Sequence, residues 1–222
     1  MQEVKCNESV LSKCAVPEGY TPYWFASERP GYCGVAVLTR VVPDRVVYGL
    51  QDENLDKEAR VITLWFSDFV LVNIYAPYSG RWLNNIEKRI KWENRFFDHM
   101  RSLMSGSLPV IVCGDFNVAS SEWDVSKSEV HPYVAGATVT ERAAFRRLLN
   151  LGFTDVFRHL NPYTKEAYSF WRYGGNHRQL NQGWRFDYFL VSQSILPAVE
   201  CCKICKELNG SDHCPVSLSL KF

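Results

Sequence analysis

Short runs rich in Val, Ile, Phe and Tyr dominate the first third of the chain, and they set the main limit on its fold. Pro, Gly and Asp bound these runs, which is typical of β-strands. Each run is far shorter than the roughly 20 apolar residues that a membrane helix needs, so we expect no membrane association. The pattern predicts strands at 23–27, 33–39, 45–50, 60–66 and 69–75.

A single long helical pattern follows these strands. Its apolar residues recur at steps of three, four or seven, which places them on one stripe of a helix. The stripe consists of Leu83, Ile86, Ile90, Phe97, Met100 and Met104.

The rest of the chain alternates between the two periods. Pro109–Cys113 is a continuous apolar run, as expected of a strand buried on both faces. Thr140 is predicted to cap a short helix through Leu149, and later strands are predicted at 186–191 and 216–220. We therefore expect one α/β domain over residues 1–222, with helices packed outside stacked sheets.

Composition supports a folded chain with reduced thiols. The 222 residues are 46% apolar and 22% charged, which excludes the disordered class and allows a large core. No basic and apolar leader opens the chain, so we expect it not to be secreted. Cys202 and Cys205 have CxxC spacing, but no second pair lies at zinc-finger distance. Reduced cysteines in a cytosolic or nuclear protein are the favoured interpretation.

A basic stretch breaks the near-neutral charge of the chain. Between Glu141 and Phe186, eight Lys and Arg residues stand against three acidic residues, for a net charge of +5. Aromatic residues are interleaved with them, so the stretch could hold a phosphate backbone and stack on bases. The alternative is a solvated surface with Arg stems lying along it, and charge alone favours that alternative.

Polar residues follow or precede several of the predicted strands. Tyr75 ends one strand, Asp115 and Asn117 follow the next, Asp187 lies in a later one, and Asp212-His213 precede the last. Strand ends can bring such residues together on rigid supports. Singly, an Asp after Gly is also a turn former, and an Asp-His pair is also a capping or surface pair. Together, hard oxygen ligands and a histidine are what a Mg²⁺ phosphoesterase needs.

The spacing of Asp115 and Asn117 suggests how they share a site. The two residues are two positions apart. On extended backbone such side chains point to the same side, so one carboxylate and one amide are expected to face the same phosphate.

Several segments, in order along nearly the whole chain, resemble the exonuclease III-type apurinic/apyrimidinic endonucleases. These enzymes belong to the endonuclease/exonuclease/phosphatase superfamily. The segments are Gln2–Lys5, Arg29–Ala36, Val72–Pro77, Gly114–Asn117, Tyr168–Trp171, Trp184–Tyr188 and Gly210–Pro215.

The resemblance implies a fold and one departure from it. The family fold is a four-layer α/β sandwich, in which helices flank two mainly antiparallel β-sheets. Family members begin with a strand that carries an Asn, whereas this sequence starts inside the motif that follows it. The first strand is therefore expected to be missing, and with it part of the stability or activity.

The resemblance also implies an activity and a set of site residues. The activity is hydrolysis of the DNA backbone 5′ to an abasic site, dependent on Mg²⁺ with Mn²⁺ as a substitute, together with 3′-exonuclease or 3′-phosphodiesterase activity. The implied catalytic residues are Tyr75, Asp115, Asn117, Asp187 and His213. The implied metal ligands are Glu3, Asp115, Asn117, Asp212 and His213. Phe170 and Trp184 match the walls of a pocket for a flipped abasic sugar, and Arg81 matches an Arg that enters the DNA groove.

Two departures weaken the expected grip on the substrate. Gly174 and Gly175 stand where animal enzymes carry bulky Met residues, and Tyr78 stands where the family often has an Asn. Two other functions stay open: a degenerate protein that binds DNA or a partner without cutting, and a phosphoesterase for a substrate other than nucleic acid. The main interpretation is a monomer acting on double-stranded DNA with abasic sites, in the nucleus, or in the cytoplasm of a prokaryote.

Overall fold

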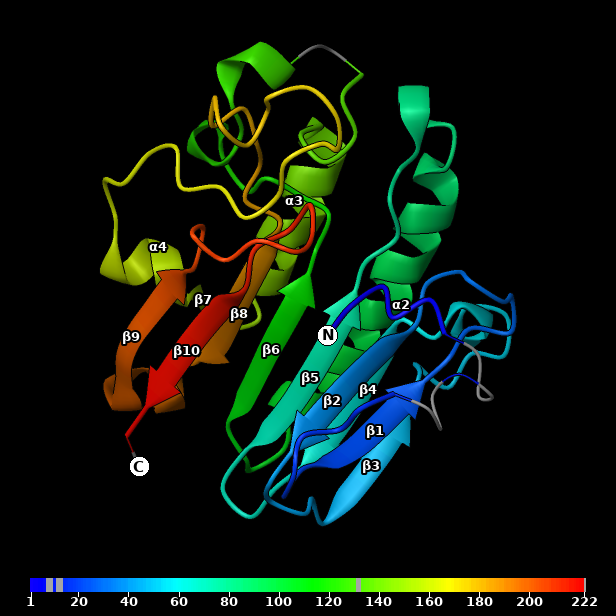
Figure 1. The fold of residues 1–222 in the computed structure, drawn as a ribbon. Helices are drawn as coiled ribbons and strands as arrows, with labels where there is room; N and C mark the ends of the chain where they lie inside the picture. The colour runs from blue at the N-terminus through cyan, green and yellow to red at the C-terminus, as the bar shows by residue number, and fades with distance from the viewer. Residues whose placement is uncertain (7–9, 11–13, 131–132, 222) are drawn as a thin grey trace.

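The computed structural model describes residues 1–6, 10, 14–130 and 133–221, and its centre is a six-stranded mixed sheet (Figure 1). The two middle strands run parallel, and α2 (Ile86–Met104) forms the long crossover that a parallel connection requires. The other neighbours in this sheet are antiparallel. In spatial order the strands are β3 (Arg45–Tyr48), β4 (Val61–Trp65), β5 (Val70–Tyr75), β6 (Val110–Asp115), β8 (Asp187–Ser192) and β7 (Phe153–Asp155).

Two separate strand pairs cover one face of this sheet. β1 (Thr21–Phe25) and β2 (Val35–Thr39) lie over β4 and β5, while β9 (Val199–Ile204) and β10 (Val216–Leu220) lie over β8. The groove between the two pairs is lined by apolar residues that include Val37, Leu71 and Val216. The predicted α/β sandwich is confirmed, with its second sheet present as two pairs of strands.

Two long helices cover the opposite face of the central sheet. α2 (Ile86–Met104) and α3 (Val139–Leu149) pack there against alternate residues of the strands, such as Val72 and Val112. The neighbouring Ile111 faces the other side, as the two-residue period of a strand requires. The central strands are thus buried on both faces, as predicted for 109–113.

The buried stripe of α2 differs from the predicted one. Its buried residues are Arg89, Trp92, Phe96 and Met100, whereas Ile90 is 37% exposed. A helix buries a stripe rather than every apolar residue. Leu83 lies outside the helix, in the turn η2 (Arg81–Leu83).

Other boundaries were also mispredicted. The cap of α3 is Thr138 rather than Thr140: its hydroxyl accepts a hydrogen bond from Glu141 N, and the Glu141 side chain accepts from the Thr138 backbone. The pattern also missed β7, β9 and α4 (Val156–Leu160). The remaining 3₁₀ turns are η1 (Asp56–Glu58), η3 (Glu122–Asp124), η4 (Lys127–Glu129) and η5 (Gln193–Ala198).

None of the helices in the described ranges combines the length and apolarity needed to cross a bilayer.

Candidate active site

Strand register places three of the predicted site residues side by side. Tyr75 on β5 pairs with Asp115 on β6, and Asp115 pairs with Asp187 on β8. Gly114 makes this close approach possible, because a Cβ there would lie 2.1 Å from the Ile74 carbonyl oxygen and its φ is +131°. Pairing within the sheet therefore sets the positions of three side chains that are far apart in sequence.

His213 enters this group from the loop that precedes β10. Its Nδ1 lies 2.8 Å from Asp187 Oδ2, and its Nε2 lies 4.0 Å from Asp115 Oδ2. The buried Ser169 Oγ accepts hydrogen bonds from the backbone N–H groups of Phe186 and Asp187, both at 3.1 Å. Ser169 thereby fixes the backbone that carries Asp187.

The electrostatics of the group favour a charged histidine and raise the pKa of the neighbouring carboxyl. Burial alone would lower the pKa of His213, but Asp187, Asp115 and Asp212 together raise it above its ordinary value. Burial, together with the charges of Asp187 and Glu3, raises the pKa of Asp115. A histidine held as the imidazolium has two N–H donors, one for Asp187 and one for an anion in front of it.

Asn117 lies beside Asp115 for a reason other than the one predicted from sequence. Its φ is +48°, so the backbone is left-handed and not extended. Its backbone N–H donates to Asp115 Oδ1 at 2.7 Å, and its side-chain Nδ2 donates to Asp115 Oδ2 at 3.2 Å and to the Ala76 carbonyl at 2.9 Å. Asn117 therefore orients the Asp115 carboxyl in this structure.

Glu3 reaches the site along the edge formed by residues 33–36. The backbone N–H groups of Val4 and Lys5 donate to the Gly34 and Cys33 carbonyls at 3.2 and 2.9 Å. The Glu3 carboxylate accepts a hydrogen bond from Tyr75 Oη and lies 2.8 Å from Lys5 Nζ. Burial would raise the pKa of Glu3, but Lys5 and Tyr75 lower it below its ordinary value. Glu3 is thus held as a carboxylate next to Tyr75.

Tyr75 is itself held by an arginine that the sequence did not suggest. The Arg60 guanidinium lies 4.6 Å from the centre of the Tyr75 ring, and its Nη1 donates to the Tyr75 carbonyl at 3.0 Å. Burial and the nearby charges of Asp115 and Glu3 raise the pKa of the Tyr75 hydroxyl. Tyr75 therefore presents a neutral hydroxyl to the site.

Asp212 lines the same groove as this group, whereas Arg81 does not. Asp212 Oδ1 accepts a hydrogen bond from Ser211 Oγ at 3.1 Å, and its charge helps to raise the pKa of His213. Arg81 lies on the exposed turn η2, with its guanidinium 5.8 Å from the centre of the Trp82 ring. Arg81 is therefore an exposed residue beside Trp82 and does not line the groove that holds the site.

An aromatic wall stands next to His213. The Phe170 ring lies 4.7 Å from the His213 ring, and Phe170 also contacts Trp184 and Phe186 at 5.6 and 5.4 Å between ring centres. Trp184 is only 2% exposed, so it backs the wall, while the half-buried Phe170 faces the histidine. The predicted pocket residues are thus adjacent to the predicted catalytic ones.

The predicted metal ligands do not form a closed cage. Within the described ranges, no three His, Cys, Asp or Glu side chains converge as a metal cluster. His213 is hydrogen-bonded to Asp187, and the Asn117 amide is hydrogen-bonded to Asp115. The donors do suit a hard cation held by one or two carboxylates and water, as Mg²⁺ prefers. Glu3 and Asp212 are the carboxylates that would hold such an ion.

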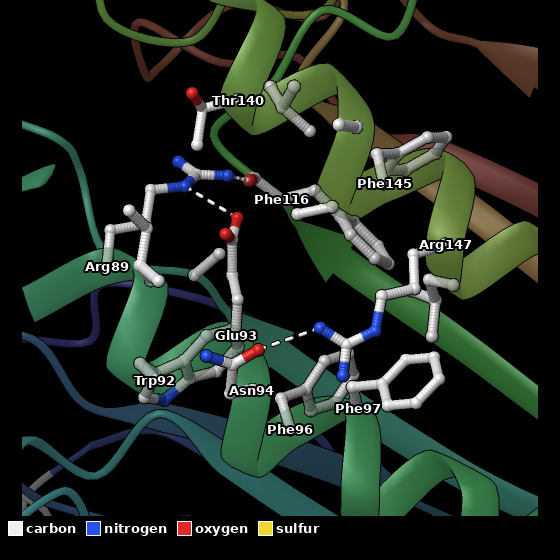
Figure 2. Close-up of a pocket in the computed structure, with 16 residues that line it drawn as sticks. Arg89, Trp92, Glu93, Asn94, Phe96, Phe97, Phe116, Thr140, Phe145 and Arg147 are labelled. Carbon is white, nitrogen blue, oxygen red and sulfur yellow. Dashed lines mark hydrogen bonds and ion pairs between the residues drawn. The ribbon is translucent and has the colours of Figure 1, made fainter. Parts of the chain in front are cut away.

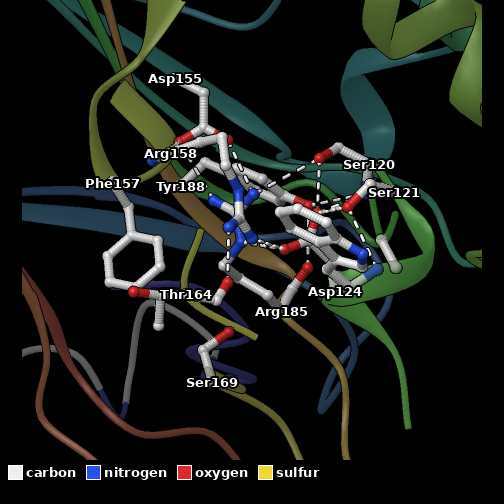
Figure 3. A network of polar contacts seen from close by, with 12 residues as sticks. Ser120, Ser121, Asp124, Asp155, Phe157, Arg158, Thr164, Ser169, Arg185 and Tyr188 are labelled. Atoms are coloured by element: carbon white, nitrogen blue, oxygen red, sulfur yellow. Dashed lines mark hydrogen bonds and ion pairs between the residues drawn. The ribbon is translucent and has the colours of Figure 1, made fainter. Parts of the chain in front are cut away.

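Arg185 lies in the basic stretch but is buried, whereas both interpretations of that stretch expected exposed side chains. This side chain is fully buried, and its guanidinium donates to Asp124 at 2.7 Å and to Asp155 at 2.7 and 3.0 Å (Figure 3). Arg158 also donates to Asp124 at 2.7 Å. Burial would raise the pKa of Asp124, but Arg185 and neighbouring hydroxyls hold it well below its usual range. Arg185 therefore supports the segment between Trp184 and Asp187 that leads into β8, and it does not contact solvent.

Comparison of the sequence with known protein families identifies the family of this chain. The family model described as "Endonuclease/Exonuclease/phosphatase family" matches residues 1–213. The chain belongs to this family. The predictions of family, fold and a nuclease-type hydrolase are confirmed.

This family member has relatives among nucleases. It is 40% identical over 222 residues to an exodeoxyribonuclease of Bacillus subtilis, covering all of this chain and 87% of that protein. It is 41% identical over 219 residues to recombination repair protein 1 of Drosophila melanogaster, covering 98% of this chain but only 32% of that protein. The structure of an AP endonuclease from Leishmania major aligns with a TM-score of 0.89 at 25% identity, covering 100% of this chain and 77% of that one.

The family member also contains a supporting arginine that the sequence did not reveal. Arg89 on α2 is buried, and its guanidinium donates to the carbonyls of Pro77 at 3.0 Å and of Phe116 and Asn117 at 2.8 Å. Figure 2 shows it between Glu93 and Phe116, and its Nε donates to Glu93 at 2.8 Å. One side chain therefore joins the loops that follow Tyr75 and Asp115. The sequence offers one signal for this role, which is the position of Arg89 next to the apolar residues Ile86 and Ile90 of the predicted helix.

Proposed function

We propose that the protein is a Mg²⁺-dependent nuclease of DNA repair that cleaves the DNA backbone 5′ to abasic sites, with 3′-end processing as a further activity. The observation that carries the proposal is the Asp187–His213–Asp115 arrangement, with Nδ1 2.8 Å from Asp187 and Nε2 4.0 Å from Asp115, set against the Phe170 wall. Relatives named as an exodeoxyribonuclease and an AP endonuclease support the same substrate class.

The polar residues suit hydrolysis of a phosphodiester. His213, protonated and oriented by Asp187, donates its Nε2 proton to a non-bridging phosphate oxygen. The neutral Tyr75 hydroxyl donates its one proton to Glu3 in this structure, and turning that proton toward the phosphate would give the phosphate a second donor. Water attacks phosphorus, the P–O3′ bond breaks, and O3′ gains a proton while the phosphate stays on the abasic sugar. Asp115, as the carboxylate, accepts the proton of the attacking water, and its raised pKa lets it release that proton through solvent to O3′. A bound divalent cation supplies positive charge against the charge that develops on the phosphate.

The aromatic wall supports a preference for abasic sites. Phe170, backed by the buried Trp184, presents an apolar ring beside His213, which suits a sugar that carries no base. An abasic nucleotide also costs less to extrude than a normal one, because no base pair must be broken. The apolar wall and the lower cost of extrusion therefore both favour the abasic nucleotide.

The test is a cleavage assay on a labelled duplex that carries one abasic site. The parent protein is expected to cut it in Mg²⁺ and not in EDTA, and to cut an intact duplex far more slowly. Asp115→Asn is expected to lower the rate by about 100-fold or more while leaving binding of the duplex intact.

The same assay separates the alternatives. Binding of the duplex without cleavage by the parent in Mg²⁺ would indicate a protein that no longer cuts. Hydrolysis of p-nitrophenyl phosphate without cleavage of any duplex would indicate a phosphoesterase for small substrates. Either result would overturn the proposal.

A further inference from the structure

The turn between β5 and α2 carries an exposed tryptophan in an unfavourable backbone conformation. Trp82 has φ +59° and ψ +23°, and the next residue, Leu83, has φ +64°. Left-handed backbone is costly for bulky residues, and two in succession are uncommon. Trp82 is nevertheless 65% exposed, so burial of its ring does not offset the cost.

The turn is held rigidly at both ends. The Asn85 N–H donates to the Ser79 carbonyl at 2.8 Å, and the Leu83 N–H donates to the Gly80 carbonyl at 3.1 Å. Ser79 is buried and its hydroxyl donates to the buried Glu141 carboxylate. Anchors of this kind keep Trp82 in one place, so little conformational freedom is lost when it contacts a partner.

The position of the turn points to DNA as that partner. It begins a few residues after Tyr75, and Figure 1 shows it rising beyond the ends of β5 and β6, on the side where the loops after β6 and before β8 also lie. Trp82 has a cation beside it, since the Arg81 guanidinium lies 5.8 Å from its ring, and the nearby Tyr78 is 50% exposed. Exposed aromatic rings next to a positive charge are the combination that stacks on bases and meets phosphates.

We infer that Trp82 is a DNA-stacking residue that places its indole ring against the bases next to the abasic site. This inference rests on the proposed function and adds to it the contact by which the protein recognises the position of the missing base. Loss of a base leaves an opening in the base stack that a planar ring can fill, whereas an intact duplex offers no such opening without unstacking. Backbone strain of this kind is often found at binding sites, which fits a role of Trp82 in contacting DNA.

Trp82→Gly is the decisive variant, because Gly adopts the left-handed conformation without strain. Binding would be measured in EDTA with a fluorescent duplex carrying a tetrahydrofuran abasic analogue, and with the matching intact duplex. We expect Trp82→Gly to weaken binding of the abasic duplex about tenfold and to change binding of the intact duplex much less. Its melting temperature should equal or exceed that of the parent. Trp82→Phe should retain most of the affinity.

Tyr48→Ala is the matched control, since Tyr48 is an exposed aromatic residue on the outer strand β3. It should leave both dissociation constants unchanged. Equal affinity of parent and Trp82→Gly for the abasic duplex would overturn the inference while leaving the proposed function intact, provided that the parent still cuts. A parent that neither prefers the abasic duplex nor cuts it would overturn both.

Discussion

Asp187 Oδ2 and His213 Nδ1 lie 2.8 Å apart, although Asp187 begins a central strand and His213 lies in a loop before the last strand. The contact fixes the ring so that Nε2 faces Asp115, and it stabilises the imidazolium. Asp187 acts on the reaction through the histidine and is therefore a positioning residue in the proposed mechanism.

Asp187→Asn tests this relationship. The amide keeps the size of the side chain but removes the charge that favours the imidazolium, so we expect kcat on abasic duplex to fall about 100-fold with a smaller change in KM. Single-turnover cleavage in Mg²⁺ would measure the chemical step. Asp98→Asn, at an exposed position on α2, is the control and should behave as the parent. A parent-like rate for Asp187→Asn would show that His213 does not depend on its carboxylate.

Glu3→Gln tests the metal assignment. The substitution keeps the shape but removes one of the two carboxylates that suit Mg²⁺, so the Mg²⁺ concentration for half-maximal rate should rise about tenfold. Circular dichroism and the melting temperature should stay close to those of the parent. Glu18→Gln, at an exposed position, is the matched control. An unchanged Mg²⁺ dependence would exclude Glu3 as a ligand.

Arg185→Met tests the buried ion-pair network. Removal of the guanidinium leaves Asp124 and Asp155 buried without their main partner, so the free energy of unfolding should fall by about 3–5 kcal/mol. Urea denaturation would measure it. Arg101→Met, which removes an exposed arginine that pairs with Asp98, should cost less than about 1 kcal/mol. If the two variants were equally stable, the network would contribute little to the fold.

His99 gives a pH prediction away from the site. Burial, helped by the charge of Arg95, lowers its pKa from 6.5 to about 4, and its Nε2 lies 3.0 Å from Thr63 Oγ1. The unfolded chain therefore binds a proton between about pH 6.5 and 4 that the folded chain does not. The free energy of unfolding is therefore highest, as far as His99 is concerned, above pH 6.5. It falls by about 2–3 kcal/mol as the pH drops through this range.

His99→Gln is expected to remove that part of the pH dependence. Urea denaturation of both proteins at pH 7 and pH 4.5 would measure the difference in the free energy of unfolding. Carboxyl groups that titrate in the same range affect both proteins alike, so the comparison isolates the histidine. Identical pH dependence in the two proteins would contradict the prediction.

Periodicity and family motifs predicted much of this structure, and their failures have physical causes. The strand ending at Tyr75 and the apolar run before Asp115 were predicted because buried central strands have continuous apolar sequence. The roles of Asn117, Thr138 and Arg185 were not predicted, since a left-handed residue, a cap two residues from the expected one and a buried charge all depend on contacts that the sequence pattern does not show.

Supporting residues were the hardest to predict. The site is held by Arg60 and Arg89, which donate hydrogen bonds to backbone carbonyls, and by Ser169, which accepts them from backbone N–H groups. These bonds join segments that are distant in sequence. The assigned roles of the site residues, the Mg²⁺ requirement, the extent of the domain, the monomeric state and the cellular location stay predictions.

The site draws on residues spread along the chain, since the Glu3–Tyr75 contact joins positions 72 apart and the Asp187–His213 contact joins positions 26 apart. Contacts between distant segments form only after the loops between them have closed. Under the proposed roles of Glu3 and His213, a partly folded molecule, or one nicked so that either end is lost, would lack part of the site. The proposed mechanism therefore implies that cleavage of DNA begins only after both ends of the chain have reached their native positions.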